Sequence, residues 1–396
     1  MGSVMMSANT VLMTALVGHL FTLEDVGKFT LSLTTSQVLY AIGLFGLNDQ
    51  QMTDYGHRYT FVDYLRVKIF STVLAAVACA VFLLAFRPDS QTTLYTVLLT
   101  GFMLVNAVAE LYQSLYFQNN RLDLSGKSLF FRYLASTAAF AIIIFWKRSI
   151  FYAILIMLVV NLAFSVWWSR YVRYFQRKEV SEKEAGRRLL KEGTVLCLCL
   201  LGSLLLINAP RYLLRYYYDD TLQGIYSLLF MPTYAVSLAA QFLFKPFLFS
   251  YKEAMGQSRQ HFWSLLKKHL LIIAGLALVA GAGAWLLGPF ALRLLFGQDI
   301  SAYRNWMFAF LLSGGILASN QLLYYLMILA EKRTAILSGY VAAIAVMLAS
   351  GVFFIPRFEI GGVWICFTAG QAVLIVKYLF EIRRLPLSRF RDSNAE

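Results

Sequence analysis

Arg211 and Arg215 are the residues of this sequence whose types and spacing are most suggestive of chemistry. They follow Asn208 and Pro210 in the segment INAPRYLLRYYYDD, four residues apart, which on a helix places both side chains on one face. An arginine at mid-membrane costs roughly 2.5–3.5 kcal/mol on insertion scales, and its planar fork of N–H donors suits phosphate. The pair predicts either a wet cavity that receives an anionic ligand or an anchor at the outer membrane rim beside Tyr216–Tyr218.

Lys245 is the third cation of interest, because it lies among phenylalanines in QFLFKPFLF and precedes the helix breaker Pro246. A side chain facing a cleft and one that snorkels to the inner interface both fit this sequence. We therefore take Arg211, Arg215 and Lys245 as candidate cavity cations that bind substrate. Three intramembrane amides are candidates for polar cavity residues or for contacts between helices: Asn48, Asn208 and Asn320.

Glu110 and Arg132 are expected to form a structural ion pair. They lie nearly equidistant from the tight turn around Leu122 that joins two apolar stretches. Antiparallel packing of those stretches would bring the two charges together.

The residue patterns of an enzyme are missing from the sequence. No two of the four histidines have ligand spacing within one apolar stretch, and there is no glycine-rich phosphate loop. The four cysteines all lie in apolar stretches, which argues against a disulfide framework or a metal site. We expect no catalytic residue, no metal and no cofactor, and the identity of any coupling ion is left open.

The elements that must position these side chains are transmembrane helices. Hydrophobic residues make up 59% of the 396 and charged residues 14%, with a mean hydropathy of +0.63. A membrane-spanning helix needs about 20 mostly apolar residues. The apolar stretches predict an all-α polytopic membrane protein with about twelve spans: 4–20, 28–46, 65–86, 93–117, 128–146, 150–169, 193–216, 222–248, 266–288, 304–329, 335–355 and 360–381.

The longest polar connection separates the first six spans from the last six. We expect an N-terminal lobe at 1–178, a cytoplasmic connector at 179–192, and a C-terminal lobe at 193–396 that ends in a short basic cytoplasmic tail. The net charge of +14 does not indicate nucleic acid, because Lys and Arg gather in alternate loops and above all in the connector. This is the positive-inside pattern, and it predicts both termini in the cytoplasm.

The two halves resemble each other. Val26–Leu33 opens the second span and Leu222–Leu229 opens the eighth, and 21 residues beyond Gly27 and Gly224 stand the polar residues Asn48 and Lys245. Six spans repeated in the same orientation predict two pseudo-symmetric lobes, an arrangement that transporters use for alternating access.

Several segments along essentially the whole chain resemble Wzx-type polysaccharide flippases of the MOP (MATE-like) superfamily. Gly43–Ser71 resembles the end of helix two and its loop, with Gln51, Thr53, Asp54, Tyr59 and Tyr64 as the most specific part, and Ile207–Leu248 resembles the helix seven–eight segment. The resemblance implies two six-helix bundles in a V shape that move undecaprenyl-diphosphate-linked oligosaccharides across the bacterial cytoplasmic membrane. It also implies Arg211, Arg215 and Lys245 as cavity cations for the diphosphate, and membrane lipids and other polysaccharide-assembly proteins as partners. Relatives often carry an arginine after the glycine that ends helix two, where this chain has Leu47.

Two rival functions stay open at this point. A MATE-type cation-coupled multidrug antiporter would need acidic residues in the cleft, where Glu110 is the strongest intramembrane candidate. A membrane-bound glycosyltransferase or polysaccharide polymerase is disfavoured by the short outer loops.

Overall fold

The computed structural model describes residues 2–54, 58–175, 184–257, 259–330 and 332–385, and within these ranges the chain is helical with no strand. The first part of the chain forms α1 (Gly2–Leu20), α2 (Leu23–Leu44), α3 (Leu47–Thr53), α4 (Phe61–Phe86), α5 (Ser90–Gln118), α6 (Leu122–Lys147), α7 (Ile150–Ser169), α8 (Val172–Phe175) and α9 (Ala185–Tyr217). The second part forms α10 (Asp220–Phe244), η1 (Lys245–Phe247), α11 (Leu248–Gln257), α12 (Arg259–Phe296), η2 (Ser301–Tyr303), α13 (Arg304–Leu329), α14 (Arg333–Phe358) and α15 (Ile360–Arg383).

Each of the twelve predicted spans coincides with a helix, which confirms an all-α polytopic membrane protein. Among the described residues, ten helical segments are long and apolar enough to cross a membrane. The two that fall short are α1, whose apolar part is only Ala8–Leu20, and α2, which buries a run of Thr and Ser side chains. The expected connector at 179–192 lies partly outside the described residues, and from Ala185 onward it belongs to α9.

The chain divides into two compact units, Met1–Leu204 and Leu205–Glu396, with the boundary inside α9. We refer to them as the N-terminal unit and the C-terminal unit. The division into functional lobes at 178 and 193 stays a prediction.

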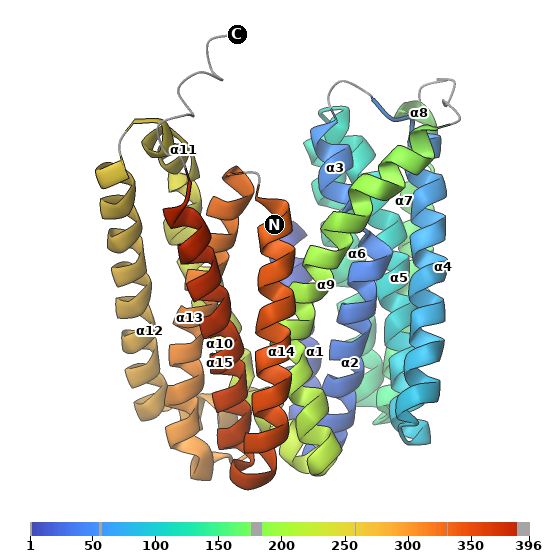
Figure 1. Cartoon of the computed structure of the whole chain (residues 1–396). Coiled ribbons are helices and arrows are strands. Elements are labelled where there is room, and N and C mark those ends of the chain that lie inside the picture. The colour runs from blue at the N-terminus through green and yellow to red at the C-terminus, as the bar shows by residue number, and fades with distance from the viewer. Residues whose placement is uncertain (1, 55–57, 176–183, 258, 331, 386–396) are drawn as a thin grey trace. The chain divides into compact units, whose positions relative to one another are not determined.

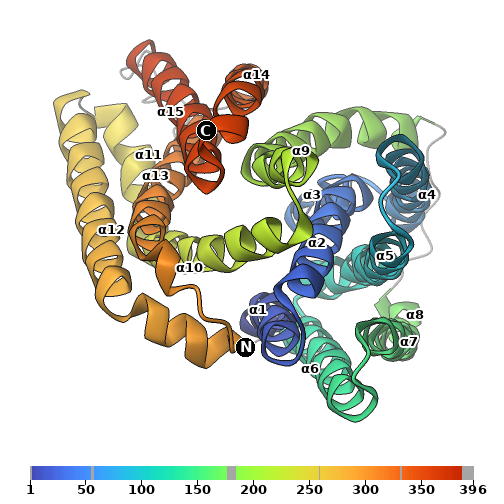
Figure 2. The same ribbon diagram turned by 90° about the horizontal axis from the view of Figure 1, so that it is seen from below.

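Small polar side chains join α2 to α5 in the N-terminal unit. The Ser32 hydroxyl donates to the carbonyl oxygen of Thr92 at 3.2 Å, and the Ser36 and Thr100 hydroxyls lie 3.1 Å apart. Such residues let two helices approach closely and bond across their interface. Figure 2 shows α5 between α2 and α7, the two helices against which it packs most.

Close approach between helices also characterises the C-terminal unit. The Thr233 hydroxyl in α10 donates to the carbonyl oxygen of Phe310 in α13 at 3.1 Å. A Cβ atom on Gly314 would lie 3.0 Å from the Thr233 carbonyl oxygen, and one on Gly362 would lie 2.3 Å from that of Phe354. Glycine is therefore required where α13 meets α10 and where α15 meets α14.

The internal packing of the two units follows the same order. In the first, α2 packs on α5, α6 on α7 and α5 on α7; in the second, α10 packs on α13, α14 on α15 and α13 on α15. The caps agree as well, because Thr22 caps α2 five residues before Gly27 and Asp219 caps α10 five residues before Gly224. This confirms two pseudo-symmetric sets of helices.

Candidate functional site

Arg211 is buried inside the C-terminal unit against two aromatic rings. It lies on α9 directly after Pro210, and only 7% of its surface is exposed. Its guanidinium carbon is 5.7 Å from the ring centre of Tyr226 and 5.6 Å from that of Phe230, both on α10. A guanidinium at this range is attracted by the negative face of an aromatic ring.

Asn208 lies one turn before Arg211 and is 1% exposed. Its side-chain oxygen has no hydrogen-bond partner among the described residues. The spacing of three residues places both side chains on the same face of α9. One face of α9 thus holds a buried cation and a buried amide.

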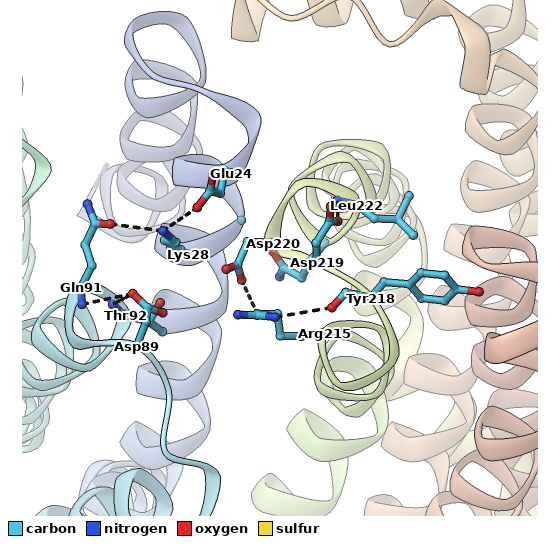
Figure 3. A network of polar contacts seen from close by, with 12 residues as sticks. Glu24, Lys28, Asp89, Gln91, Thr92, Arg215, Tyr218, Asp219, Asp220 and Leu222 are labelled. Atoms are coloured by element: carbon cyan, nitrogen blue, oxygen red, sulfur yellow. Dashed lines mark hydrogen bonds and ion pairs between the residues drawn. The ribbon is translucent and has the colours of Figure 1, made fainter.

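Arg215 has a counter-ion in the turn between α9 and α10. Figure 3 shows its guanidinium pointing toward the carboxylate of Asp220, with which it forms an ion pair. Its Nη1 also donates to the carbonyl oxygen of Tyr218 at 3.4 Å, and the Asp219 carboxylate accepts from the backbone N–H of Leu222 at 2.9 Å to cap α10. This geometry fits the rim-anchor interpretation of Arg215 better than the cavity interpretation.

Lys245 lies far from the arginines, in the short turn η1 that ends α10. Its side chain is exposed, with Nζ 5.6 Å from the ring centre of Tyr325 on α13. Fifteen residues separate it from Phe230, the ring beside Arg211, which is about 22 Å of helix. The structure therefore gives one cation near each end of α10 rather than a cluster of three.

Asn320 is buried in a contact between α13 and α15. Its amide nitrogen donates to the side-chain oxygen of Gln371 at 2.6 Å and to the Gln371 carbonyl oxygen at 3.0 Å. This is the helix contact that we predicted as one of its two alternatives.

Asn48 belongs to a polar network in the N-terminal unit that the sequence did not reveal. Its amide donates to Glu110, which also accepts from the Tyr40 hydroxyl, and its oxygen accepts from Lys68 Nζ at 3.2 Å. Lys68 is 0% exposed and also donates to the carbonyl oxygens of Gly43 and Leu44 at 3.3 and 3.1 Å. We define Tyr40, Asn48, Lys68 and Glu110 as the N-unit network.

Lys68 and Tyr40 are the residues that sequence reasoning missed. Lys68 counts as a cytoplasmic charge in the sequence, yet it lies two turns inside α4. The signal was its depth beyond the capping residue Thr60, where an apolar helix rarely carries an unpaired lysine.

Arg132 lies on α6, is 2% exposed, and has its guanidinium carbon 5.4 Å from the ring centre of Tyr133. Glu110 accepts hydrogen bonds from Tyr40 and Asn48. The ion pair of Glu110 with Arg132 stays a prediction.

The motif that carries the family resemblance forms a structural cluster after α3. The Asp54 carboxylate accepts from the backbone N–H groups of Arg58 and Tyr59 at 2.9 and 3.1 Å and from the Tyr64 hydroxyl at 3.2 Å. The Tyr59 hydroxyl donates to Glu192 on α9 at 3.2 Å. Burial raises the pKa of Tyr59, and the neighbouring Glu192 carboxylate raises it further.

Residues 6–249 match the model of a family described as "Polysaccharide biosynthesis protein". The chain belongs to this family, the Wzx-type flippases. The match covers all but the first five residues of the N-terminal unit and includes Arg211, Arg215 and Lys245. Among curated proteins, none matches this chain.

Several solved structures share the fold of this polysaccharide biosynthesis family member. An inward-facing multidrug resistance MATE transporter of the MOP superfamily has a TM-score of 0.62 at 12% identity, over 98% of this chain and 96% of its own. The lipid II flippase MurJ has a TM-score of 0.61 at 11% identity, over 98% and 88%. A MOP superfamily transporter from Pyrococcus furiosus has 0.63 at 12%, over 99% and 94%.

Proposed function

We propose that this chain carries an undecaprenyl-diphosphate-linked oligosaccharide across the bacterial cytoplasmic membrane by alternating access, and that Arg211 contacts the diphosphate. The observation that carries the proposal is a buried guanidinium held by aromatic faces beside the amide of Asn208, in a chain of the polysaccharide biosynthesis family. Ring faces stabilise the cation, and the planar fork of the guanidinium matches the geometry of phosphate oxygens.

The physical task is to move a charged headgroup and a sugar chain through hydrocarbon. A buried cation lowers the desolvation cost of the diphosphate at the point where water is scarce. Lys245, at the other end of α10, is proposed as a second contact that the headgroup meets before or after Arg211. A membrane potential that is negative inside favours outward movement of an anion by about 2.3 kcal/mol per charge per 100 mV.

The membrane setting extends the proposal. The basic loops favour cytoplasmic termini, so the connector at 179–192, whose last part opens α9, would lie on the cytoplasmic side. Membrane lipids surround the chain, the oligosaccharide lipid is its cargo, and other polysaccharide-assembly proteins are proposed as partners. The role is transport rather than catalysis.

A cation-coupled multidrug antiporter is the second candidate, since drug transporters share the fold. Such an antiporter would need a carboxylate that binds the cationic drug or the coupling cation. The carboxylate of Glu110 instead accepts hydrogen bonds from Tyr40 and Asn48, and the family match is to polysaccharide biosynthesis. These observations favour the flippase.

The test compares Arg211→Ala with Arg357→Ala in cells that depend on this chain for surface glycan. Arg357 is a matched control, because it is an exposed arginine that also lies over a ring, 3.9 Å from that of Phe353. We expect Arg211→Ala to lose surface glycan at normal protein level and Arg357→Ala to keep it. Normal glycan in Arg211→Ala, or a change in drug tolerance alone, would contradict the proposal.

A further inference from the structure

A small cavity lies between α5, α6 and α7, inside the N-terminal unit. It is lined by Tyr112, Gln113 and Tyr116 from one face of α5, by Arg132 from α6 and by Trp168 from α7. Its free space is about that of one water-sized particle. A ligand that fills it must therefore be monatomic or nearly so.

The buried side-chain atoms of the cavity lining that make no hydrogen bond to a described residue are all donors. Buried Nε and Nη2 of Arg132, Nε2 of Gln113 and Nε1 of Trp168 have no hydrogen-bond partner within the described parts of the chain. The neighbouring hydroxyl of Tyr116 already donates elsewhere, to the carbonyl oxygen of Trp168 at 2.7 Å. Four N–H donors from three helices thus border this cavity without making a hydrogen bond to the hydroxyls of Ser128 and Ser165, which also line it, and buried donors of this kind need an acceptor.

The charge balance of the surroundings points to the sign of the ligand. Arg132 is 2% exposed, and its Nε and Nη2 have no hydrogen-bond partner among the residues that the structure describes. A buried charge without a partner is strongly unfavourable, so an anion is the ligand that suits this site.

We propose that this cavity binds a small monovalent anion of the halide class, chloride in the cell, held by Arg132, Gln113 and Trp168. A water molecule would accept hydrogen bonds but would leave the positive charge unbalanced. A phosphate or a carboxylate is too large for the space. The anion ties α5, α6 and α7 together and stabilises the N-terminal unit, and this inference does not depend on the proposed transport function.

The test measures thermal unfolding of the purified full chain in sodium chloride and in sodium gluconate at equal ionic strength. Gluconate is too large for the cavity, so only chloride should raise the midpoint, in a saturating manner. Trp168→Phe removes one donor and keeps the ring, and we expect it to weaken the apparent chloride affinity about tenfold. Trp146→Phe is the matched control, because Trp146 on α6 is an exposed tryptophan away from the cavity, and it should respond to chloride like the wild type.

Arg132→Gln is expected to abolish the chloride response, and if it does not fold, Trp168→Phe decides the matter alone. Bromide with anomalous diffraction supplies a direct readout, with a peak expected within hydrogen-bond distance of Trp168 Nε1. Equal midpoints in chloride and gluconate would overturn the proposal. So would a chloride response that Trp168→Phe leaves unchanged, or a bromide peak only at other sites.

Discussion

The two units hold their buried charges in different ways, although their helices pack in the same order. In the N-terminal unit, Lys68 and Glu110 are bridged by Asn48, so that charge is met by polar groups of the protein itself. In the C-terminal unit, the guanidinium of Arg211 lies over the rings of Tyr226 and Phe230. We propose that the bridged Lys68–Glu110 pair serves the stability of the fold, whereas the ring-contacted guanidinium of Arg211 serves the binding of an anionic substrate.

The largest effect on stability should come from breaking the N-unit network. Glu110→Leu removes the carboxylate near Lys68, which leaves a buried cation without its compensation. We expect the free energy of unfolding to fall by about 3 kcal/mol. Thermal unfolding of the purified protein measures it, with Glu24→Gln as control, because Glu24 is exposed and pairs with Lys28 at the start of α2.

A second substitution sharpens this test. Lys68→Met combined with Glu110→Leu removes both charges, and the double variant should be more stable than the sum of the two single effects predicts. Additive losses would show that the two charges do not compensate each other.

Replacing Arg211 should affect stability less than replacing Glu110. Arg211→Met loses the attraction to two rings but also removes the cost of burying a cation, and the two terms oppose each other. We expect the free energy of unfolding to stay within about 2 kcal/mol of the wild type. A loss as large as that of Glu110→Leu would remove the contrast between the units.

Arg215 should behave as a structural residue at the turn from α9 to α10. Its partner is Asp220, and its side chain is partly exposed, so Arg215→Gln should cost at most about 1 kcal/mol and leave transport intact. Asp220→Asn should have a similar effect on unfolding. A loss of transport in Arg215→Gln but not in Asp220→Asn would instead indicate that Arg215 binds the substrate.

The smallest effect concerns the cap of α5. Burial raises the pKa of Asp89, but hydrogen bonds from Thr92 and Gln91 outweigh it, and the net pKa is lowered. The stability that Asp89 contributes is therefore present above its unfolded-state pKa and is lost as the pH falls through the folded-state pKa. Asp89→Ser keeps a cap without a titrating group, and its unfolding midpoint should fall less with acid than that of the wild type. An identical acid response in both proteins would rule out this role.

Hydropathy predicted the helices, and the internal repeat predicted two similar sets of them, because exposure to lipid requires an apolar composition. The helices extend beyond the predicted spans where the flanks are polar: α12 begins at Arg259 rather than at 266, since a basic amphipathic lead-in continues the same helical hydrogen bonding. The partners of buried charges could not be predicted in the same way. Lys68 reaches the carbonyl oxygens that end α2, a contact that depends on which helix packs beside α4. Asp220 is only five residues from Arg215, yet the sequence did not predict their ion pair, because Arg215 was interpreted as a cavity cation or a rim anchor.

The central claim is that Arg211 receives the diphosphate of a lipid-linked oligosaccharide. The most direct measurement is the rate at which proteoliposomes translocate undecaprenyl-diphosphate-linked oligosaccharide with wild type, Arg211→Lys, Arg211→Ala and the control Arg357→Ala. A lost charge-assisted contact of about 2 kcal/mol predicts a rate about thirtyfold lower for Arg211→Ala. Arg211→Lys should be intermediate, because it keeps the charge without the fork. Wild-type rates in Arg211→Ala, with Arg357→Ala equally active, would contradict the account.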